Sequence, residues 1–165
     1  MEPDIAMPKT KRRRQFAALP FRTSPDGVQV LLVTSRDTGR WVIPKGWPMK
    51  NRRPHRAAAI EAYEEAGVVG KADKSALGTY DYEKRTEAGD IPCRVTVFPL
   101  PVVRLEDEWP EKAQRRRAWY RLEEASGLVE EPELQAILRA FGRRAEKQLA
   151  GRGGSAKAAA EELAA

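Results

Sequence analysis

The sequence predicts one mixed α/β domain in which two helices cover a sheet, and three observations lead to this prediction. Short runs with β-like patterns occupy residues 15–22, 27–36, 40–46, 75–85 and 93–105. An alanine-rich run between Pro54 and Gly67 indicates a helix, and an amphipathic run at 131–149 indicates a second, closing helix. With 165 residues, the chain is long enough for one domain with its own core.

The β-like runs predict two hairpins and one further short strand. The first two runs are separated by TSPDG, in which proline and glycine supply the dihedral angles of a turn. The run at 40–46 is expected to be one strand, closed by Pro44 and Gly46. The runs at 75–85 and 93–105 are expected to pair around the sequence TEAGDIP.

The helix that starts at Pro54 is the clearest element in the sequence. Proline suits the first position of a helix and Gly67 suits the position just past its end, while Arg53 offers no side-chain acceptor as an N-cap. Residues 116–129 then predict a short strand or turn followed by a short helix. The closing helix has its apolar residues at helical spacing: Leu134, Ile137, Leu138 and Phe141.

Composition limits the kind of protein that this can be. We expect a loose arm at 1–11, one domain at 12–147 and a loose tail at 148–165, because both ends lack bulky apolar residues at regular spacing. A single cysteine, Cys93, excludes an internal disulfide and a cysteine metal cluster. No apolar stretch approaches the roughly 18 residues of a membrane span, and no secretory signal is recognisable, so we expect a cytoplasmic protein.

Charge indicates an anionic partner. The chain carries 30 Lys and Arg against 24 Asp and Glu, a net charge of +6 with a pI near 9.6. A protein with this charge attracts polyanions, which include nucleic acid, anionic lipid and phosphorylated small molecules.

The helix that follows Pro54 carries a cluster of carboxylates. At 100° per residue, Glu61, Glu64 and Glu65 share one side with Ala57 and Ala58. The opposite side is expected to pack on the sheet through small and apolar residues: Ala59, Ala62, Tyr63 and Ala66. Like charges at this spacing repel each other by a few tenths of a kcal/mol per pair, roughly.

Two interpretations of the acidic side remain open: a solvated surface or a metal site. No Lys or Arg lies between Glu61 and Val68 to offset the repulsion. Carboxylates without a neighbouring cation suit a hard divalent ion such as Mg²⁺ or Mn²⁺. Such a metal beside arginines commonly serves a phosphate substrate, so we favour the metal site.

The same residues resemble the signature of the Nudix hydrolases, G-x5-E-x7-R-E-U-x-E-E-x-G-U, in which U is a bulky apolar residue. On this chain the signature starts at Gly46, includes Glu61, Glu64 and Glu65, and ends with Gly67 and Val68. Similarity extends to VLLVTSRDTGRWVIPKG before it and RRRAWYRLEEA after it, and covers residues 12–142. The resemblance implies a Nudix-type α/β/α sandwich with a mixed sheet.

Within that family, the runs RRRQFAALPFR, VLLVTSR and RWVIPKG most resemble the diphosphoinositol and diadenosine polyphosphate hydrolases. The resemblance implies that Glu61 and Glu65 bind metal with the Gly46 carbonyl, and that Glu64 is a ligand or the base that deprotonates water. The sequence does not decide which glutamate is the base. Substrate phosphates are expected to contact a set of basic and hydroxyl side chains, including a basic loop before the helix: Arg13, Arg14, Ser35, Arg36, Lys45, Lys50, Arg52 and Arg116.

Two positions depart from the signature. Arg52 stands where the family has a glutamate, and Ile60 stands where it has an arginine that pairs with a signature carboxylate and orients it. We expect Ile60 to pack against the sheet and Arg56, one turn earlier, to compensate in part for the lost arginine.

These features predict metal-dependent hydrolysis of a phosphoanhydride bond in a nucleoside- or inositol-linked polyphosphate, with Mg²⁺ or Mn²⁺ as cofactor. The replacement at Ile60 leaves open a catalytically poor domain that only binds a phosphorylated ligand. The arginines at 12–14 leave open an RNA-binding module, although the aromatic and basic pattern of common RNA folds is missing. We expect a phosphorylated small molecule as partner, neither a membrane nor nucleic acid, and the sequence carries no signal for an oligomeric state.

Overall fold

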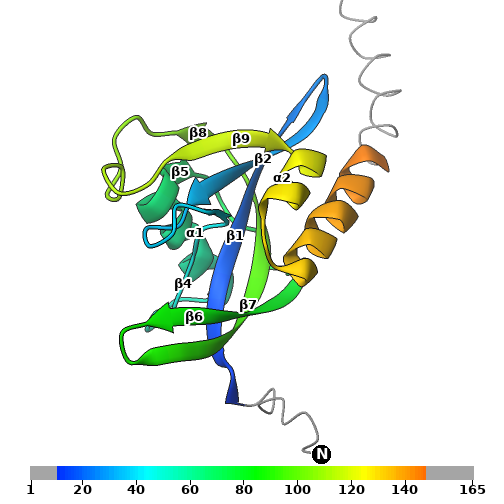
Figure 1. Ribbon diagram of the computed structural model, residues 1–165. Helices are drawn as coiled ribbons and strands as arrows, with labels where there is room; N and C mark the ends of the chain where they lie inside the picture. The colour runs from blue at the N-terminus through cyan, green and yellow to red at the C-terminus, as the bar shows by residue number, and fades with distance from the viewer. Residues whose placement is uncertain (1–10, 148–165) are drawn as a thin grey trace, which may run out of the picture.

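The computed structural model describes residues 11–147, so the tail predicted at 148–165, and the predicted arm apart from Lys11, lie outside the described residues. The sheet has seven strands (Figure 1). Five of them follow the order β3-β2-β1-β7-β6, and the other two, β4 and β9, pair with β1 and β2 respectively. A separate pair joins β5 (Val68–Val69) and β8 (Arg104–Leu105). The bounds of the sheet strands are β1 Arg13–Ser24, β2 Gly27–Thr34, β3 Trp41–Val42, β4 Lys45–Gly46, β6 Gly78–Thr86, β7 Gly89–Pro101 and β9 Arg117–Arg121.

The central strand β1 makes the sheet mixed. It runs parallel to β7 and antiparallel to β2 and β4. Both hairpins that the sequence predicts are confirmed, as β1–β2 and β6–β7. The α/β class and the mixed sheet are confirmed as well.

Alternation along the strands divides the core between the two faces of the sheet, because successive side chains point to opposite faces. Ala17 and Leu19 of β1 lie in one apolar cluster, whereas Phe16 and Ala18 lie in the other. The first cluster includes residues of α2 (Leu122–Leu128) and of the closing helix, residues 132–147. The second includes residues of α1 (Pro54–Ala66), so the helices lie on opposite faces, as Figure 1 shows.

Helix α1 has the ends that the sequence predicts. Pro54 is its first residue, Arg53 makes no side-chain cap, and Gly67 follows in the left-handed conformation with φ 68°. The Gly67 N–H donates to the Tyr63 carbonyl at 2.9 Å, which ends the helix. Within residues 11–147, no helix is long and apolar enough to cross a membrane.

Two local predictions need correction. The single strand expected at 40–46 is two short strands, β3 and β4, that pair with β2 and β1 respectively. The assignment of faces on α1 is partly wrong, because Tyr63 is 42% exposed while Ala57 and Ala58 are fully buried. The buried residues of the helix are Ala57, Ala58, Ala62, Glu65 and Ala66. They form one arc that takes in part of the predicted acidic side and leaves Tyr63 outside.

Candidate active site

Glu61 and Glu65 come together beside the backbone of β4. Gly46 makes this approach possible: a Cβ atom at this position would lie 2.3 Å from the carboxylate carbon of Glu61. A larger residue would push the Glu61 side chain away, so glycine here lets the first glycine of the predicted signature and its first clustered glutamate lie in direct contact. Glu65, one turn later on α1, is 5% exposed and hydrogen-bonded to Glu61.

The loop between β8 and β9, together with the first residue of β9, holds the last turn of α1, which carries Glu65. Trp109 donates its indole N–H to the Glu65 carbonyl at 3.0 Å, and Arg117 donates to the Ala66 carbonyl at 2.8 Å. The Arg117 guanidinium also lies 3.8 Å from the centre of the Trp109 ring. Carbonyls at a helix C-terminus lack partners within the helix, so these side chains satisfy them and fix the turn.

Arg115 of the same loop reaches the carboxylate itself. Its Nη2 atom lies 3.7 Å from Oε1 of Glu65, and its side chain is only 10% exposed. It is held there by Glu111, whose Oε1 accepts from Nε at 2.9 Å, and by the Thr34 carbonyl, which accepts from Nη1 at 3.0 Å. A buried guanidinium with a fixed orientation therefore faces the buried glutamate.

Burial controls the protonation of the two glutamates. Burial raises the pKa of Glu65 to about 8, although the positive charges of Arg115 and Lys45 oppose the rise. Burial also raises the pKa of Glu61, while its hydrogen bond with Glu65 acts in the opposite direction. Two carboxyl groups that share a hydrogen bond must share a proton, so near neutral pH Glu65 donates to the Glu61 carboxylate.

These groups fit a divalent cation by the chemistry of their oxygen atoms, which are the ligands that Mg²⁺ and Mn²⁺ accept. A cation at this position would take the place of the shared proton. Within residues 11–147, however, no three acidic, histidine or cysteine side chains converge closely enough to hold one ion. The groups in contact are Glu61, Glu65 and the adjoining backbone of β4. The negative charge of Glu64 acts on Glu61.

A cleft with two chambers leads away from Glu65. The inner chamber, of about 90 Å³, is lined by Glu65 itself and has an excess of basic side chains. Its four basic residues are Arg36, Lys45, Lys84 and Arg115, and its two carboxylates are Asp37 and Glu65. Burial lowers the pKa of Lys45 to about 8, and Glu65 partly opposes this shift.

The outer chamber is larger, about 690 Å³, and carboxylates outnumber basic residues in its lining. Its six carboxylates are Asp37, Asp81, Glu83, Asp90, Glu130 and Glu131, against the four basic residues Arg40, Lys45, Lys84 and Arg85. Arg12 and Arg94, outside the lining, pair with two of these carboxylates, Asp81 and Glu83. At its wall, Arg40 donates to Glu131 at 2.9 Å. The remaining Nη1 of Arg40 and Oε1 of Glu131 are buried without a hydrogen-bond partner in the described part of the chain.

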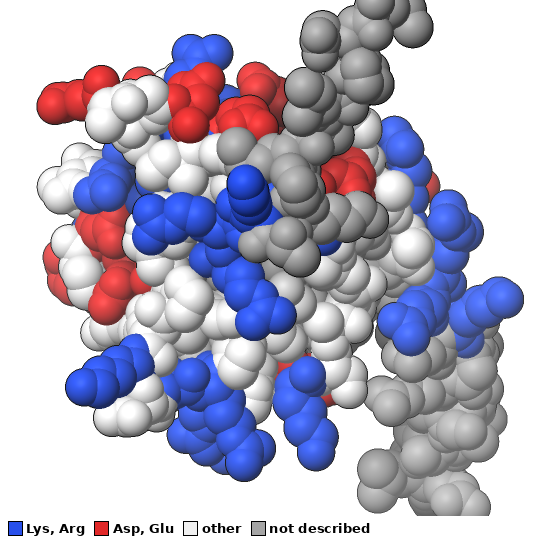
Figure 2. All heavy atoms as spheres, turned by 90° about the horizontal axis from the view of Figure 1, so that it is seen from below, with Lys and Arg blue, Asp and Glu red and all other residues white. Residues whose placement is uncertain are grey.

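The predicted substrate-binding residues divide between the cleft and other surfaces. Ser35, Arg36 and Lys45 line the inner chamber. The others are exposed and line neither chamber: Arg13, Arg14, Lys50, Arg52 and Arg116. Arg13 lies 4.6 Å over the Trp47 ring, and Arg116 lies 6.0 Å over the Trp41 ring. Figure 2 shows many Lys and Arg side chains over the middle and lower part of the face seen from below.

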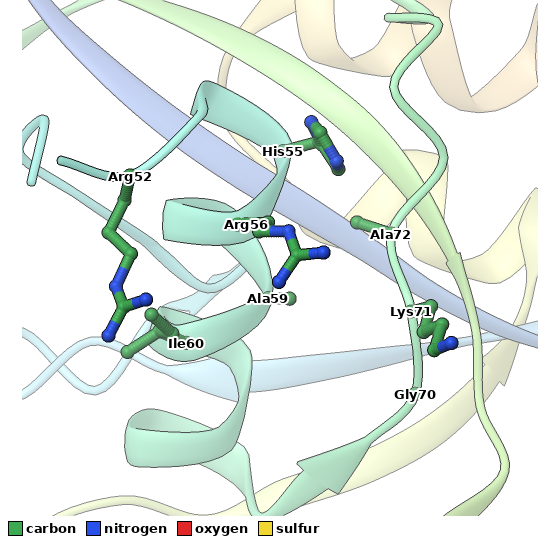
Figure 3. A pocket seen from close by; sticks show the side chains of 8 residues that line it. All are labelled: Arg52, His55, Arg56, Ala59, Ile60, Gly70, Lys71 and Ala72. Atoms are coloured by element: carbon green, nitrogen blue, oxygen red, sulfur yellow. The ribbon is translucent and has the colours of Figure 1, made fainter.

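The two departures from the signature lie next to each other. Arg52 and Ile60 line one cavity on the outer side of α1, and Figure 3 shows the Arg52 guanidinium beside the Ile60 side chain. The expectation that Ile60 packs against the sheet is wrong, since Ile60 belongs to neither apolar cluster of the core. Arg56 lines the same cavity, away from the glutamates, so it does not compensate for the missing arginine.

Sequence reasoning missed several residues of the site. Arg115 was one of three consecutive arginines, and nothing in the sequence separated it from Arg116. Arg40, Lys84 and Glu131 lie in three different segments, whose convergence depends on the sheet.

Comparison with known proteins decides the family. The family model of the NUDIX domain matches residues 11–143, almost all of the described chain. The chain belongs to the Nudix family. The signature and the layered fold described above are therefore those of a Nudix domain.

The similar curated proteins are phosphohydrolases. Diphosphoinositol polyphosphate phosphohydrolase 3-alpha of Mus musculus is 33% identical over 120 residues, which cover 72% of this chain and 70% of the relative. Diphosphoinositol polyphosphate phosphohydrolase 2 of Rattus norvegicus is 31% identical over 120 residues, covering 72% and 63%. Family and relatives together make this Nudix protein an enzyme, a pyrophosphohydrolase, of a family that generally uses divalent metal ions.

Solved structures share the fold. The Ap4A hydrolase of C. elegans superposes with a TM-score of 0.56 at 17% identity, over 79% of this chain and 96% of that one. A NUDIX hydrolase from Nitrosomonas europaea gives 0.61 at 18% identity, over 82% and 91%. At this level of identity the similarity concerns the Nudix fold alone.

Proposed function

We propose that this Nudix enzyme hydrolyses a phosphoanhydride bond in a nucleoside-linked polyphosphate, such as a diadenosine polyphosphate, with Mg²⁺ or Mn²⁺ as cofactor. The observation that carries the proposal is the division of charge in the cleft. The inner chamber next to Glu65 is basic, and the outer chamber is rich in carboxylates. A linear polyphosphate with an uncharged nucleoside end matches this order, with its phosphates in the basic inner chamber and its nucleoside in the outer chamber.

The proposed roles follow from position. Glu61, Glu65 and the Gly46 carbonyl would hold the cation, and Glu64 would accept the proton of the attacking water. A divalent ion held there would supply positive charge for the phosphoryl oxygens and would make a bound water more acidic. Arg36, Lys45 and Lys84 would bind the phosphates, with the Ser35 hydroxyl nearby. Arg115 would keep Glu65 oriented, and Arg13, Arg14, Lys50, Arg52 and Arg116 stay predictions for phosphates that extend beyond the cleft.

The nucleoside would occupy the outer chamber. The unpartnered Nη1 of Arg40 and Oε1 of Glu131 offer one donor and one acceptor at its wall, and burying such atoms without a partner is unfavourable. A base edge or ribose hydroxyls can satisfy both. An inositol polyphosphate carries phosphates around its ring and would place several of them against the six carboxylates of this chamber.

A diphosphoinositol polyphosphate is the second candidate, because the curated relatives at 33% identity are named for that activity. The test is a product-resolved hydrolysis assay with Mg²⁺ and with Mn²⁺, in which both classes of compound are supplied at equal concentration. We expect a higher kcat/KM for the diadenosine polyphosphates. A higher value for the diphosphoinositol compounds would reject the substrate assignment, and no turnover of any phosphoanhydride would reject the proposed reaction.

Glu131→Gln is the variant that examines the nucleoside site. It keeps the size of the side chain and replaces one acceptor by a donor, so kcat/KM for a diadenosine polyphosphate should fall by about tenfold. Hydrolysis of a phosphoanhydride without a nucleoside should change little. An exposed carboxylate outside the cleft, Glu124→Gln, is the matched control.

A further inference from the structure

A second cavity lies on the outer side of α1, between this helix and the segment that follows β5. Its volume is about 360 Å³, within the range of small-molecule sites. Gly70 brings the segment close to the sheet, because a Cβ there would lie 2.4 Å from the Pro101 carbonyl oxygen. In Figure 3 the Arg56 side chain extends from the helix toward the segment, the Lys71 side chain lies over the segment itself, and Arg52 lies along the helix beside Ile60.

The cationic side chains of this cavity have no partners. Arg52, Arg56 and Lys71 are exposed, and within residues 11–147 none of the three makes an ion pair or a side-chain hydrogen bond. No carboxylate lines the cavity. By contrast, Arg12, Arg40, Arg94 and Arg115 are each paired with an Asp or Glu. Three unpaired cations around one hollow create a local positive potential that favours an anion.

The floor of the cavity is apolar. It is made by Ala59 and Ile60 of α1 and by Ala72, and Tyr63 lies one helical turn further along the same side with 42% of its surface exposed. Inorganic phosphate would leave this apolar surface in water. An anion with an aromatic or apolar portion would cover it, since burying apolar area is favourable and an exposed tyrosine ring can stack on an aromatic group.

This cavity is separate from the metal-binding side of the helix. Successive residues rotate by about 100°, so Arg56, Ala59 and Tyr63 point roughly 140° to 160° away from Glu61. The cavity and the two cleft chambers have no lining residue in common. The two signature positions with altered residues account for its character: arginine replaces an acid at Arg52, and Ile60 replaces an arginine with an apolar side chain.

We propose that this cavity is a second ligand site, which binds a small organic phosphate through Arg52, Arg56 and Lys71 and packs its aromatic or apolar part on Ala59 and Ile60. Apart from Arg52, which stays a predicted contact for substrate phosphates, the residues of this site have no part in the proposed reaction. Its ligand is a phosphate monoester of nucleotide size that carries an aromatic group.

The test is an NMR titration of ¹⁵N-labelled full-length protein with AMP, which contains no phosphoanhydride bond. We expect saturable shifts of the amides at 52–60 and 70–72, much weaker shifts with inorganic phosphate, and none there with adenosine. Arg56→Glu and Lys71→Glu should each weaken AMP binding by about tenfold. Arg121→Glu, an exposed and unpaired cation of β9, is the matched control and should leave binding unchanged.

The variant Glu61→Gln separates this inference from the proposed function. It should abolish hydrolysis and leave AMP binding at 52–72 intact. Arg56→Glu should weaken AMP binding and leave hydrolysis intact. Shifts confined to the cleft, equal binding of Arg56→Glu and native protein, or a response to an acidic peptide but not to AMP would each overturn the proposal.

Discussion

The two sides of α1 differ in the sign and the burial of their charged side chains. On the inner side, Glu61 and Glu65 are held against Gly46 and Arg115, and their burial raises the pKa of both carboxyl groups. On the outer side, Arg52 and Arg56 are exposed and make no ion pair with any residue in the part of the chain that the structure describes. Burial of like charges is unfavourable unless a cation compensates, whereas exposed cations cost little. We therefore propose that the inner side binds a cation and that the outer side binds an anion.

The largest expected effect belongs to Glu65→Gln on the inner side. Loss of one metal ligand should lower kcat by about 10²- to 10³-fold, because a bound cation stabilises the transition state by several kcal/mol. Thermal unfolding without metal should show a stability at least equal to that of the native protein, since the variant no longer buries a carboxyl group. A variant with native activity would contradict the role of Glu65, and Glu123→Gln on α2 serves as control.

Gly46→Ala should have the next largest effect on kcat. The added methyl group would occupy the position of the Glu61 carboxylate and displace it, and a shift of about 1 Å in a reacting group can lower the rate by roughly 10²-fold. Measurement of kcat together with Mn²⁺ affinity tests this expectation. Gly127→Ala is the matched control, because nothing lies within 4 Å of a Cβ at that position.

Arg115→Met examines the cation that faces Glu65. Partners of metal ligands typically contribute about 10- to 100-fold to activity or metal affinity, and we expect a loss in this range. The pH profile should also shift upward, because Glu65 loses a positive charge that favours its ionised form. Arg116→Met, which removes only a contact near Trp41, should have a smaller effect. If Arg116→Met were the more damaging change, the role of Arg115 would be wrong.

The sequence predicted α1 and its ends because their signals are local: a proline, a glycine and the helical spacing between them. It also predicted that Gly46 and the glutamates belong together, from a resemblance in spacing. Arg115, Arg40 and Glu131 could not be predicted in the same way, since loop 106–116 and the start of the closing helix reach the site only through the sheet. The exposure of Tyr63 and the position of Ile60 depended on which arc of α1 faces the sheet, and helical spacing alone does not determine that arc.

Stability should depend on pH in the metal-free protein. Glu65 has a folded pKa of about 8 and a reference value of 4.5, so between these values the unfolded state binds fewer protons and stability falls as pH rises. Lys45 has a folded pKa of about 8 and a reference value of 10.5. Between these values the unfolded state binds more protons, so stability should rise again as pH rises. Thermal unfolding in EDTA should therefore show a minimum near pH 8 that Mg²⁺ removes, and a flat profile would contradict these shifts.

The smallest effect is expected from Ile60→Arg, which restores the signature arginine on the outer side. Because Arg115 already faces Glu65, hydrolysis should change by less than about threefold. The same variant should alter AMP binding, since Ile60 lines the outer cavity. Restoration of much higher activity would show that the native site lacks an orienting cation.

The most direct test of the account is a crystal structure with Mg²⁺ and a non-hydrolysable diadenosine polyphosphate. We predict an ion bound by Glu61, Glu65 and the Gly46 carbonyl, with the phosphates in the inner chamber and one nucleoside in the outer chamber. An ion held elsewhere, with Glu61 and Glu65 still joined by their hydrogen bond, would contradict it.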